Sequence, residues 1–268
     1  MQWSKPLVRV SGFWISFIIL LFVSGSVLNF GLSGQWHRAV YGVVGTLLVF
    51  VLTWLWSNRQ WQQVKAYGIL WRNGSGKKLL LGLLIGAILI VLMLMVLLVF
   101  TPLRISPTKV NLNADLGLWL FSLVVFAYLE ELAFRGMPLV ELHKKFGFLP
   151  AQCIVAFVFA IYHVNYGWSL MVAFMGPFVW SFIFGLARQY TQGIAMPTGI
   201  HISLNAGQVI LGLQPSTASM FTLDVPGQVT PSMQSRIDMT GLALQIILAI
   251  AGIILSYRYH KRNSIIAG

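Results

Sequence analysis

The stretch Glu130-Glu131-Leu132-Ala133-Phe134-Arg135 decides what kind of fold this chain adopts. It closes an apolar run that begins at Leu116, where three ionisable side chains have no ordinary place. A charge near the centre of a bilayer costs roughly 2.5 to 3.5 kcal/mol on insertion scales, so adjacent acids in such a run indicate function. We therefore expect a membrane helix that carries part of a functional site.

The composition supports a membrane protein. Of the 268 residues, 57% are hydrophobic and 9% are charged, and the mean hydropathy is +0.80. Soluble domains contain about 25% charged residues. The net charge of +12 would suggest nucleic acid in a soluble chain, but the basic residues lie between apolar runs, which indicates membrane topology instead. We expect membrane lipid, and no nucleic acid, as a partner.

The apolar runs predict an all-α, polytopic integral membrane protein with about eight transmembrane helices. A span needs about 17 to 25 mostly apolar residues. The candidates are Phe13 to Phe30, Ala39 to Trp56, Leu79 to Thr101, Leu116 to Arg135, Pro150 to His163, Trp168 to Ala187, Ile194 to Leu213, and Met239 to Tyr257. We expect one membrane domain, residues 1–268, with a catalytic core segment at 110–213 and the site between helices 4, 5 and 7.

Two of these spans are irregular, and both carry a candidate histidine. The fifth is short, and the seventh is interrupted by Pro197 and Gly199. A short or broken helix in lipid needs protein or a wet cavity around it. We therefore expect these two helices to be surrounded by the rest of the bundle.

The charges of the loops predict the orientation of the chain in the membrane. With the N-terminus inside, only four of the 18 lysines and arginines fall on the far side, namely Arg38, Arg104, Lys109 and Arg236. Cytoplasmic loops carry the excess of Lys and Arg. We therefore expect both termini to be cytoplasmic, in a bacterial cell membrane.

Helical spacing gives the two acids different tasks. Glu131 and Arg135 are four residues apart, so they share a face and can pair. Glu130 is rotated by about 100° and has no such local partner. We expect Glu131 to stay ionised against Arg135, which leaves Glu130 free to exchange protons as a general base.

A second motif, Phe159-x-x-x-His163, lies on the next span. A hairpin that turns near Gly147 would bring Glu130 and His163 to similar depth, a little over about 20 Å from the turn at about 1.5 Å per residue. Pro138 would then have to kink the helix without ending it. Phe159 shares a face with His163 and would wall the site or hold the ring, with ordinary packing as the alternative.

A third motif, His201-x-x-x-Asn205, also places its two residues on one face. A histidine and an amide there are suitable donors toward a developing oxyanion. Taken singly, a membrane histidine is more often a helix–helix hydrogen bonder, and the acids with Arg135 could form a structural ion-pair network. All three motifs in consecutive order favour a functional site.

At these residues the sequence resembles the CPBP family, the CAAX proteases and bacteriocin-processing or immunity proteins also called Abi. That family has a Glu-Glu-x-x-x-Arg, a Phe-x-x-x-His and a His-x-x-x-Asn/Asp motif on successive membrane helices, and all three are present here. The resemblance spans roughly Leu116 to Gly212. It implies a glutamate-dependent intramembrane endopeptidase, related to the type II CAAX prenyl endopeptidases.

The resemblance also implies a role for each site residue. Glu130 and His163 would activate the attacking water, and His201 and Asn205 would stabilise the tetrahedral oxyanion. Glu131 and Arg135, together with Phe159, would support that arrangement. The substrate would be a membrane-associated or lipidated peptide or protein, either prenylated or a peptide precursor.

Three alternatives remain from the sequence. The first is a metal-dependent protease in which Glu130, His163 and His201 hold zinc; we expect no cofactor, because the chain has no His-Glu-x-x-His and its one cysteine, Cys153, cannot form a thiolate cluster. The second is a non-catalytic bacteriocin-immunity or scaffold protein that retains the motif residues. The third is a proton-coupled transporter, although no repeat symmetry supports it.

Overall fold

The computed structural model describes residues 4–29, 31–32, 34–109, 114–213 and 219–267, apart from the side chains of residues 4, 114–115 and 263–267. Phe30, at the end of the first expected span, and residues 110–113, at the start of the expected core segment, lie outside the described residues.

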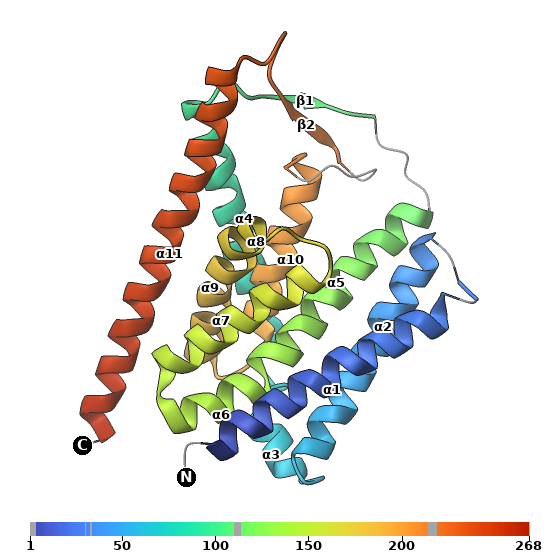
Figure 1. Cartoon of the computed structure of the whole chain (residues 1–268), viewed down its shortest axis with the longest axis vertical. Coiled ribbons are helices and arrows are strands. Elements are labelled where there is room, and N and C mark those ends of the chain that lie inside the picture. Colours follow the sequence, from blue (N-terminus) through green and yellow to red (C-terminus); the bar gives the residue numbers. More distant parts are fainter. Residues whose placement is uncertain (1–3, 30, 33, 110–113, 214–218, 268) are drawn as a thin grey trace.

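Long helices make up most of the described chain, which confirms the expected all-α polytopic membrane fold (Figure 1). The longer helices are α1 (Ser4–Leu28), α2 (Gly34–Trp56), α4 (Ser75–Phe100), α5 (Ala114–Arg135), α7 (Phe148–Asn165), α9 (Val179–Thr191), α10 (Ala195–Ile210) and α11 (Pro231–Ala267). The shorter ones are α3 (Trp61–Ala66), α6 (Met137–Phe146), α8 (Leu170–Ala173) and the π-helical turn η1 (Phe174–Phe178). Strands β1 (Arg104–Pro107) and β2 (Phe221–Asp224) form an antiparallel ribbon.

Within the described residues, seven segments are long and apolar enough to cross a membrane, one fewer than expected. The exception is the seventh expected span, which forms the 16-residue helix α10. That helix packs against α4, α5 and α9. Its neighbours therefore supply the protein surroundings that a short helix in lipid requires.

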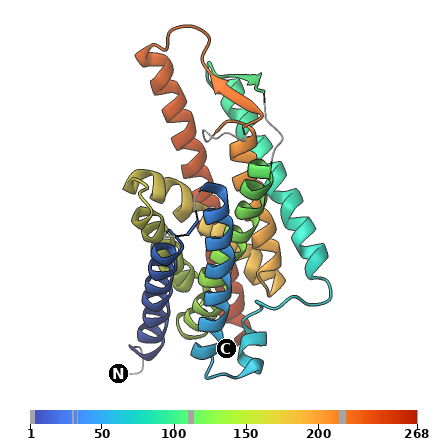
Figure 2. The same cartoon turned by 90° about the vertical axis from the view of Figure 1, so that its right-hand side faces the viewer.

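The two ends of the bundle differ in charge. The start of α1 and the end of α11 lie at one end together with α3 and α6, and the β1–β2 ribbon lies at the other (Figures 1 and 2). We call these the basic end and the ribbon end. The basic end carries Lys5, Arg9, Arg59, Lys65, Arg72, Lys77, Lys78, Lys144, Lys145, Arg188, Arg258, Lys261 and Arg262, and the ribbon end carries Arg38, Arg104, Lys109 and Arg236. This separation matches the loop charges on which the expected orientation rests.

The expected turn at Gly147 is present, whereas the expected behaviour of Pro138 is wrong. Gly147 has φ +79° and joins α6 to α7. The chain does not continue through Pro138 as one kinked helix: α5 ends at Arg135, and Pro138 lies in the first turn of the separate helix α6. Proline is tolerated there because the first backbone N–H groups of a helix have no intrahelical partner.

Helices α4 and α10 approach each other at glycines. A Cβ atom at Gly86 would come within 2.7 Å of the carbonyl oxygen of Ile200, and Cβ atoms at Gly82 and Gly199 would meet the backbones of Met196 and Leu79. Small residues allow the backbones of membrane helices to pack this closely. The Gly82-x-x-x-Gly86 spacing therefore fixes α10, and with it His201, against α4.

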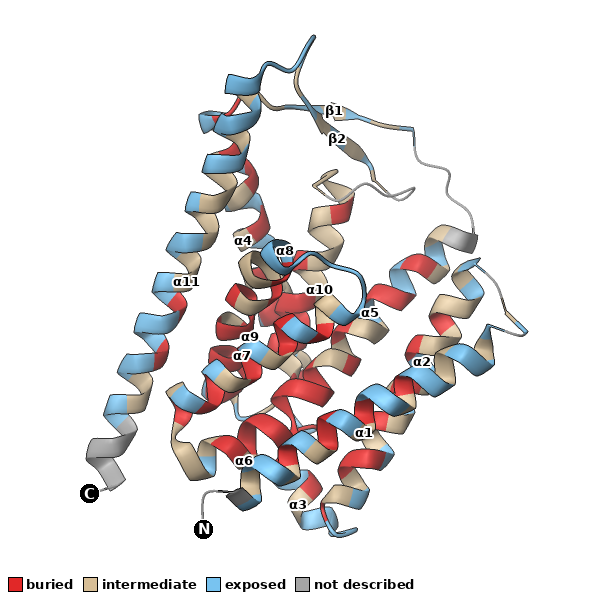
Figure 3. Ribbon diagram, viewed as in Figure 1, coloured by how far each residue is buried: buried red, intermediate tan, exposed pale blue. Residues whose placement is uncertain are grey.

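Burial is concentrated in the interior of the bundle between the middle of α5 and the basic end (Figure 3). Exposed apolar side chains cover the outward faces of α1, α4 and α11, for example Phe22, Leu84 and Ile247. In an aqueous protein such surfaces would be unfavourable, but in a bilayer they face lipid.

Candidate active site

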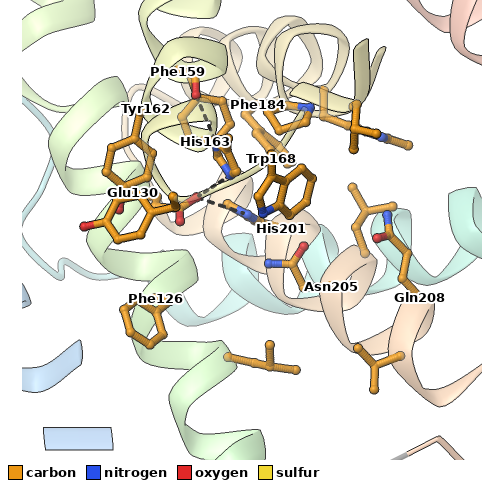
Figure 4. Close-up of a pocket in the computed structure, with 18 of the residues that line it drawn as sticks. Phe126, Glu130, Phe159, Tyr162, His163, Trp168, Phe184, His201, Asn205 and Gln208 are labelled. Carbon is orange, nitrogen blue, oxygen red and sulfur yellow. Dashed lines mark hydrogen bonds and ion pairs between the residues drawn. The ribbon is translucent and has the colours of Figure 1, made fainter. Parts of the chain in front are cut away.

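Three helices bring one carboxylate and two imidazoles together. Oε2 of Glu130 on α5 lies 3.9 Å from Nε2 of His163 on α7 and 3.6 Å from Nε2 of His201 on α10 (Figure 4). This oxygen is buried and makes no hydrogen bond to the described residues. Both distances exceed a direct hydrogen bond, and a water molecule is the usual bridge between polar atoms at such separations.

The other nitrogen of each imidazole is held in place. Nδ1 of His163 donates to the backbone carbonyl of Phe159, 2.8 Å away, because a carbonyl oxygen can only accept. Nδ1 of His201 lies 3.0 Å from Oε1 of Glu131, and a carboxylate oxygen accepts this hydrogen bond. Both rings therefore turn Nε2 toward Glu130.

Glu131 and Arg135 form the fully buried ion pair that their spacing predicted. Nη1 of Arg135 lies 3.4 Å from Oε1 of Glu131, and both side chains have no exposed surface. Nη2 of Arg135 donates to Oγ of Ser181 on α9 at 2.8 Å. The amide of Gln152 in turn donates to the Ser181 backbone carbonyl at 2.7 Å. The pair therefore ties α5 to α7 and α9 beneath the site.

The Arg135 guanidinium also lies between two phenyl rings, each of which contacts one of the site histidines. Its central carbon is 4.2 Å from the ring centre of Phe159 and 5.1 Å from that of Phe184. Phe159 meets the His163 ring edge to face, with centres 4.6 Å apart, and Phe184 stacks on His201 at 4.6 Å. Arg135 therefore supports both imidazoles through cation–π contacts.

The site opens into a cavity of about 780 Å³. Glu130, His163, His201 and Asn205 all line it, and the Asn205 amide lies beside His201 (Figure 4). Trp168 closes one side, with its ring centre 5.1 Å from that of His163. A cavity of this size is large enough to hold a peptide segment and to keep a reacting carbonyl group near the carboxylate and both imidazoles.

All seven residues singled out from the sequence meet here, with Glu130, His163, His201 and Asn205 on the cavity wall and Glu131 and Arg135 behind it. The role of each remains a prediction. Phe159 both lines the cavity and holds His163.

Sequence reasoning missed the residues that support the site from other helices, namely Gln152, Ser181 and Phe184. A polar glutamine within an apolar span was a signal available for Gln152. Nothing in the local sequence distinguishes Ser181 or Phe184 from ordinary residues of a membrane helix, because their contacts depend on tertiary packing.

Among the described residues, no group of three or more His, Cys, Asp and Glu side chains is arranged to hold a metal ion. Glu130, His163 and His201, the set named for the metal-dependent alternative, lie close together, and zinc binding by them stays a prediction. In that set both Nε2 atoms are turned toward the same carboxylate oxygen.

Fold and site together define a polytopic membrane protein with a buried glutamate–histidine centre reached from a cavity. Residues 112–207 match the family described as "Type II CAAX prenyl endopeptidase Rce1-like". This match covers about a third of the chain and supports the resemblance to the CPBP/CAAX protease family that the three motifs indicated. A comparison with curated proteins gives no match.

Proposed function

We propose that this protein is an intramembrane endopeptidase that hydrolyses a peptide bond with water activated by Glu130 and His163. One observation carries the proposal: the unpartnered Oε2 of Glu130 faces Nε2 of both His163 and His201 on the wall of a cavity large enough for a peptide. The family match supports the same reaction class, because the matching family is one of proteases.

The positions of the residues suggest a role for each in the reaction. A water molecule between Glu130 and His163 gives a proton to the carboxylate as its oxygen attacks the peptide carbonyl carbon. The oxyanion that forms accepts hydrogen bonds from His201, when its Nε2 is protonated, and from the Asn205 amide. The proton held by Glu130 then passes to the amide nitrogen as the oxyanion reforms a carbonyl group and the C–N bond breaks, which releases the amine and leaves a carboxylic acid.

Glu131 and Arg135 hold His201 in position for this role. Oε1 of Glu131 lies 3.0 Å from Nδ1 of His201 and 3.4 Å from Nη1 of Arg135, so one carboxylate oxygen contacts both side chains. Because Nδ1 is fixed in this way, Nε2 of His201 is directed toward Glu130 on the cavity wall. Pairing with Arg135 also reduces the cost of burying the Glu131 carboxylate in the bundle.

The direct test is the variant Glu130→Gln in purified protein reconstituted into liposomes. The substrates are intramolecularly quenched peptides with an apolar segment, prepared with and without a C-terminal lipid. We expect cleavage to fall by about 10² to 10⁴-fold or more, because the amide cannot accept the proton of water. Retention of full cleavage by the folded variant would end the proposal.

A matched control separates catalysis from general loss of charge. Glu141 on α6 pairs with Arg9 and Lys144 at the basic end, away from the cavity. Glu141→Gln should therefore keep its activity. If Glu130→Gln, His163→Ala and His201→Ala all leave a cellular phenotype intact, the non-catalytic immunity or scaffold function is favoured instead.

A further inference from the structure

Along α5 and α10 the cavity extends from the site in one direction only, whereas on α7 its lining includes residues on both sides of His163, among them Phe159 and Tyr166. On α5 its lining residues all precede Glu130, and on α10 they all follow His201: Trp119, Leu123 and Phe126 on the first helix, and Leu204, Asn205, Gln208 and Val209 on the second. Helix α5 runs toward the basic end and α10 runs away from it (Figure 1). Both sets therefore lie between the site and the ribbon end, as do Arg38 and Tyr41 near the start of α2.

The other side of the site is closed. The residues that continue α5 toward the basic end, Leu132, Ala133, Phe134 and Arg135, are at most 1% exposed. Met137 and Leu139 at the start of α6 have no exposed surface, and the buried residues of this region fill the bundle interior (Figure 3). A smaller cavity of about 180 Å³ lies at the basic end and is lined by Tyr128 and Thr198, but it contains none of the three site residues. The packed side chains of α5 and α6 therefore close the route from the basic end to Glu130.

The charge of the loops orients this one-sided cavity in the membrane. The basic end carries most of the lysines and arginines, and loops rich in these residues stay in the cytoplasm. We propose that the site receives its substrate from the non-cytoplasmic face of the membrane, through the cavity that opens toward the ribbon end. That the substrate is a peptide rests on the proposed function, whereas the position of the cavity does not depend on it.

The direction of entry restricts the class of substrate. A peptide in the cavity must come from an exported precursor or from the external segment of a membrane protein. The C-terminal tail of a cytoplasmic protein cannot reach Glu130 without crossing the bilayer. The lining is rich in aromatic side chains such as Tyr41, Trp119 and Trp168, which suits an apolar peptide segment at the membrane interface.

Cysteine labelling tests the direction of entry without any need for activity. Cys153→Ser gives a chain free of cysteine, into which single cysteines are placed at Gln208 on the cavity wall, Gln228 at the ribbon end and Asn73 at the basic end. The variants are expressed in a bacterial inner membrane and treated with a membrane-impermeant maleimide in right-side-out and inverted vesicles.

We expect the Gln208→Cys and Gln228→Cys variants to react in right-side-out vesicles and Asn73→Cys only in inverted ones. Reaction of Gln208→Cys from the same side as Asn73→Cys would overturn the one-sided cavity. Reaction of Gln228→Cys only in inverted vesicles would overturn the orientation. A quenched peptide added outside gives the second readout: cleavage by inverted vesicles alone contradicts this inference, whereas no cleavage by either preparation contradicts the proposed function.

A separate observation concerns Arg38 on the cavity wall. Its guanidinium lies over the rings of Trp119 and Phe126, 5.9 and 5.6 Å from their centres, and its Nε atom is buried without a hydrogen-bond partner. No acidic side chain pairs with it within the described part of the chain. Phe126 is one helical turn before Glu130, about 6 Å along α5, so this cation faces the space that a bound peptide fills.

We propose that Arg38 binds a carboxylate of the substrate, either its C-terminus or an acidic side chain. The guanidinium presents a planar fork that matches a carboxylate, and the aromatic rings hold it in place. Like the direction of entry, this proposal rests on a peptide occupying the cavity. Arg38 would then determine which peptides bind, without taking part in the chemical step.

Binding to the Glu130→Gln variant tests this proposal separately from catalysis. Fluorescent peptides are compared in pairs that differ only in a C-terminal carboxylate against an amide, or in Glu against Gln. When Arg38→Gln is combined with Glu130→Gln, the carboxylate peptide of one pair should bind about tenfold more weakly, as expected for loss of one charge-assisted hydrogen bond. It should then bind no more tightly than the uncharged peptide of the same pair. The control Arg104→Gln, at an exposed position on β1, should change neither pair. If Glu130→Gln protein with Arg38 intact binds the two peptides of each pair with equal affinity, Arg38 does not bind a substrate carboxylate.

Discussion

Arg135 offers the sharpest test of how the site is supported. It is fully buried, pairs with Glu131, donates to Ser181 and lies between Phe159 and Phe184. Lysine at this position would keep the positive charge but lose the planar contact with the two rings and one of the two directed hydrogen bonds. Methionine would fill similar space and remove the charge altogether.

The expected magnitudes differ between the two variants. Arg135→Met leaves the buried Glu131 carboxylate with His201 as its remaining partner, and breaking a buried pair in this way costs about 3 to 5 kcal/mol. Arg135→Lys should cost about 1.5 to 3 kcal/mol, the usual contribution of a hydrogen bond to a charged group. Because Phe159 and Phe184 position the two imidazoles, a shift of about 1 Å there should reduce cleavage about 100-fold even in the lysine variant.

The assay measures the free energy of unfolding in mixed micelles and the rate of peptide cleavage on the same samples. Arg188→Lys is the matched control. Arg188, on α9, is buried like Arg135, but it donates to the Tyr67 carbonyl and to Gln189, outside the site. It should lose stability without a comparable loss of cleavage rate. Full activity of Arg135→Lys, or equal loss of activity in both lysine variants, would refute a specific role for Arg135.

Three further predictions concern the oxyanion, the packing of α10 and the metal question. Asn205→Ala should lower kcat about 10² to 10³-fold with little change in KM, because its amide acts on the oxyanion; a change confined to KM would contradict that role. Gly199→Val should destabilise the protein and lower activity, since its side chain would meet the backbone of α4 at Leu79, whereas Gly241→Val, with open space around it, should do neither. Cleavage should persist after treatment with a chelator, and activity lost to the chelator and restored by zinc would favour the metal-dependent alternative.

The local periodicity of the sequence was sufficient for much of the fold and the site. Apolar run length indicated most of the spans, since the bilayer thickness fixes the length of a helix that crosses it. The i, i+4 spacing predicted the Glu131–Arg135 pair, and Gly147 marked the turn that brings Glu130 and His163 to the same depth. Pro138 was misjudged because the preceding Gly136 breaks the helix, with ψ −120°, before the proline is reached.

The sequence by itself determined which side chains can carry out chemistry, because charged and polar residues in lipid are costly and therefore few. Only the tertiary structure decided that Phe159 and Phe184 both contact Arg135, that glycines on α4 place α10, and that Glu130 lines a cavity together with Trp119 and Gln208. These features depend on contacts between helices that lie far apart in the chain. Helical periodicity shows which residues share a face, but the partner of that face and the open side of the site are set by how the helices pack together.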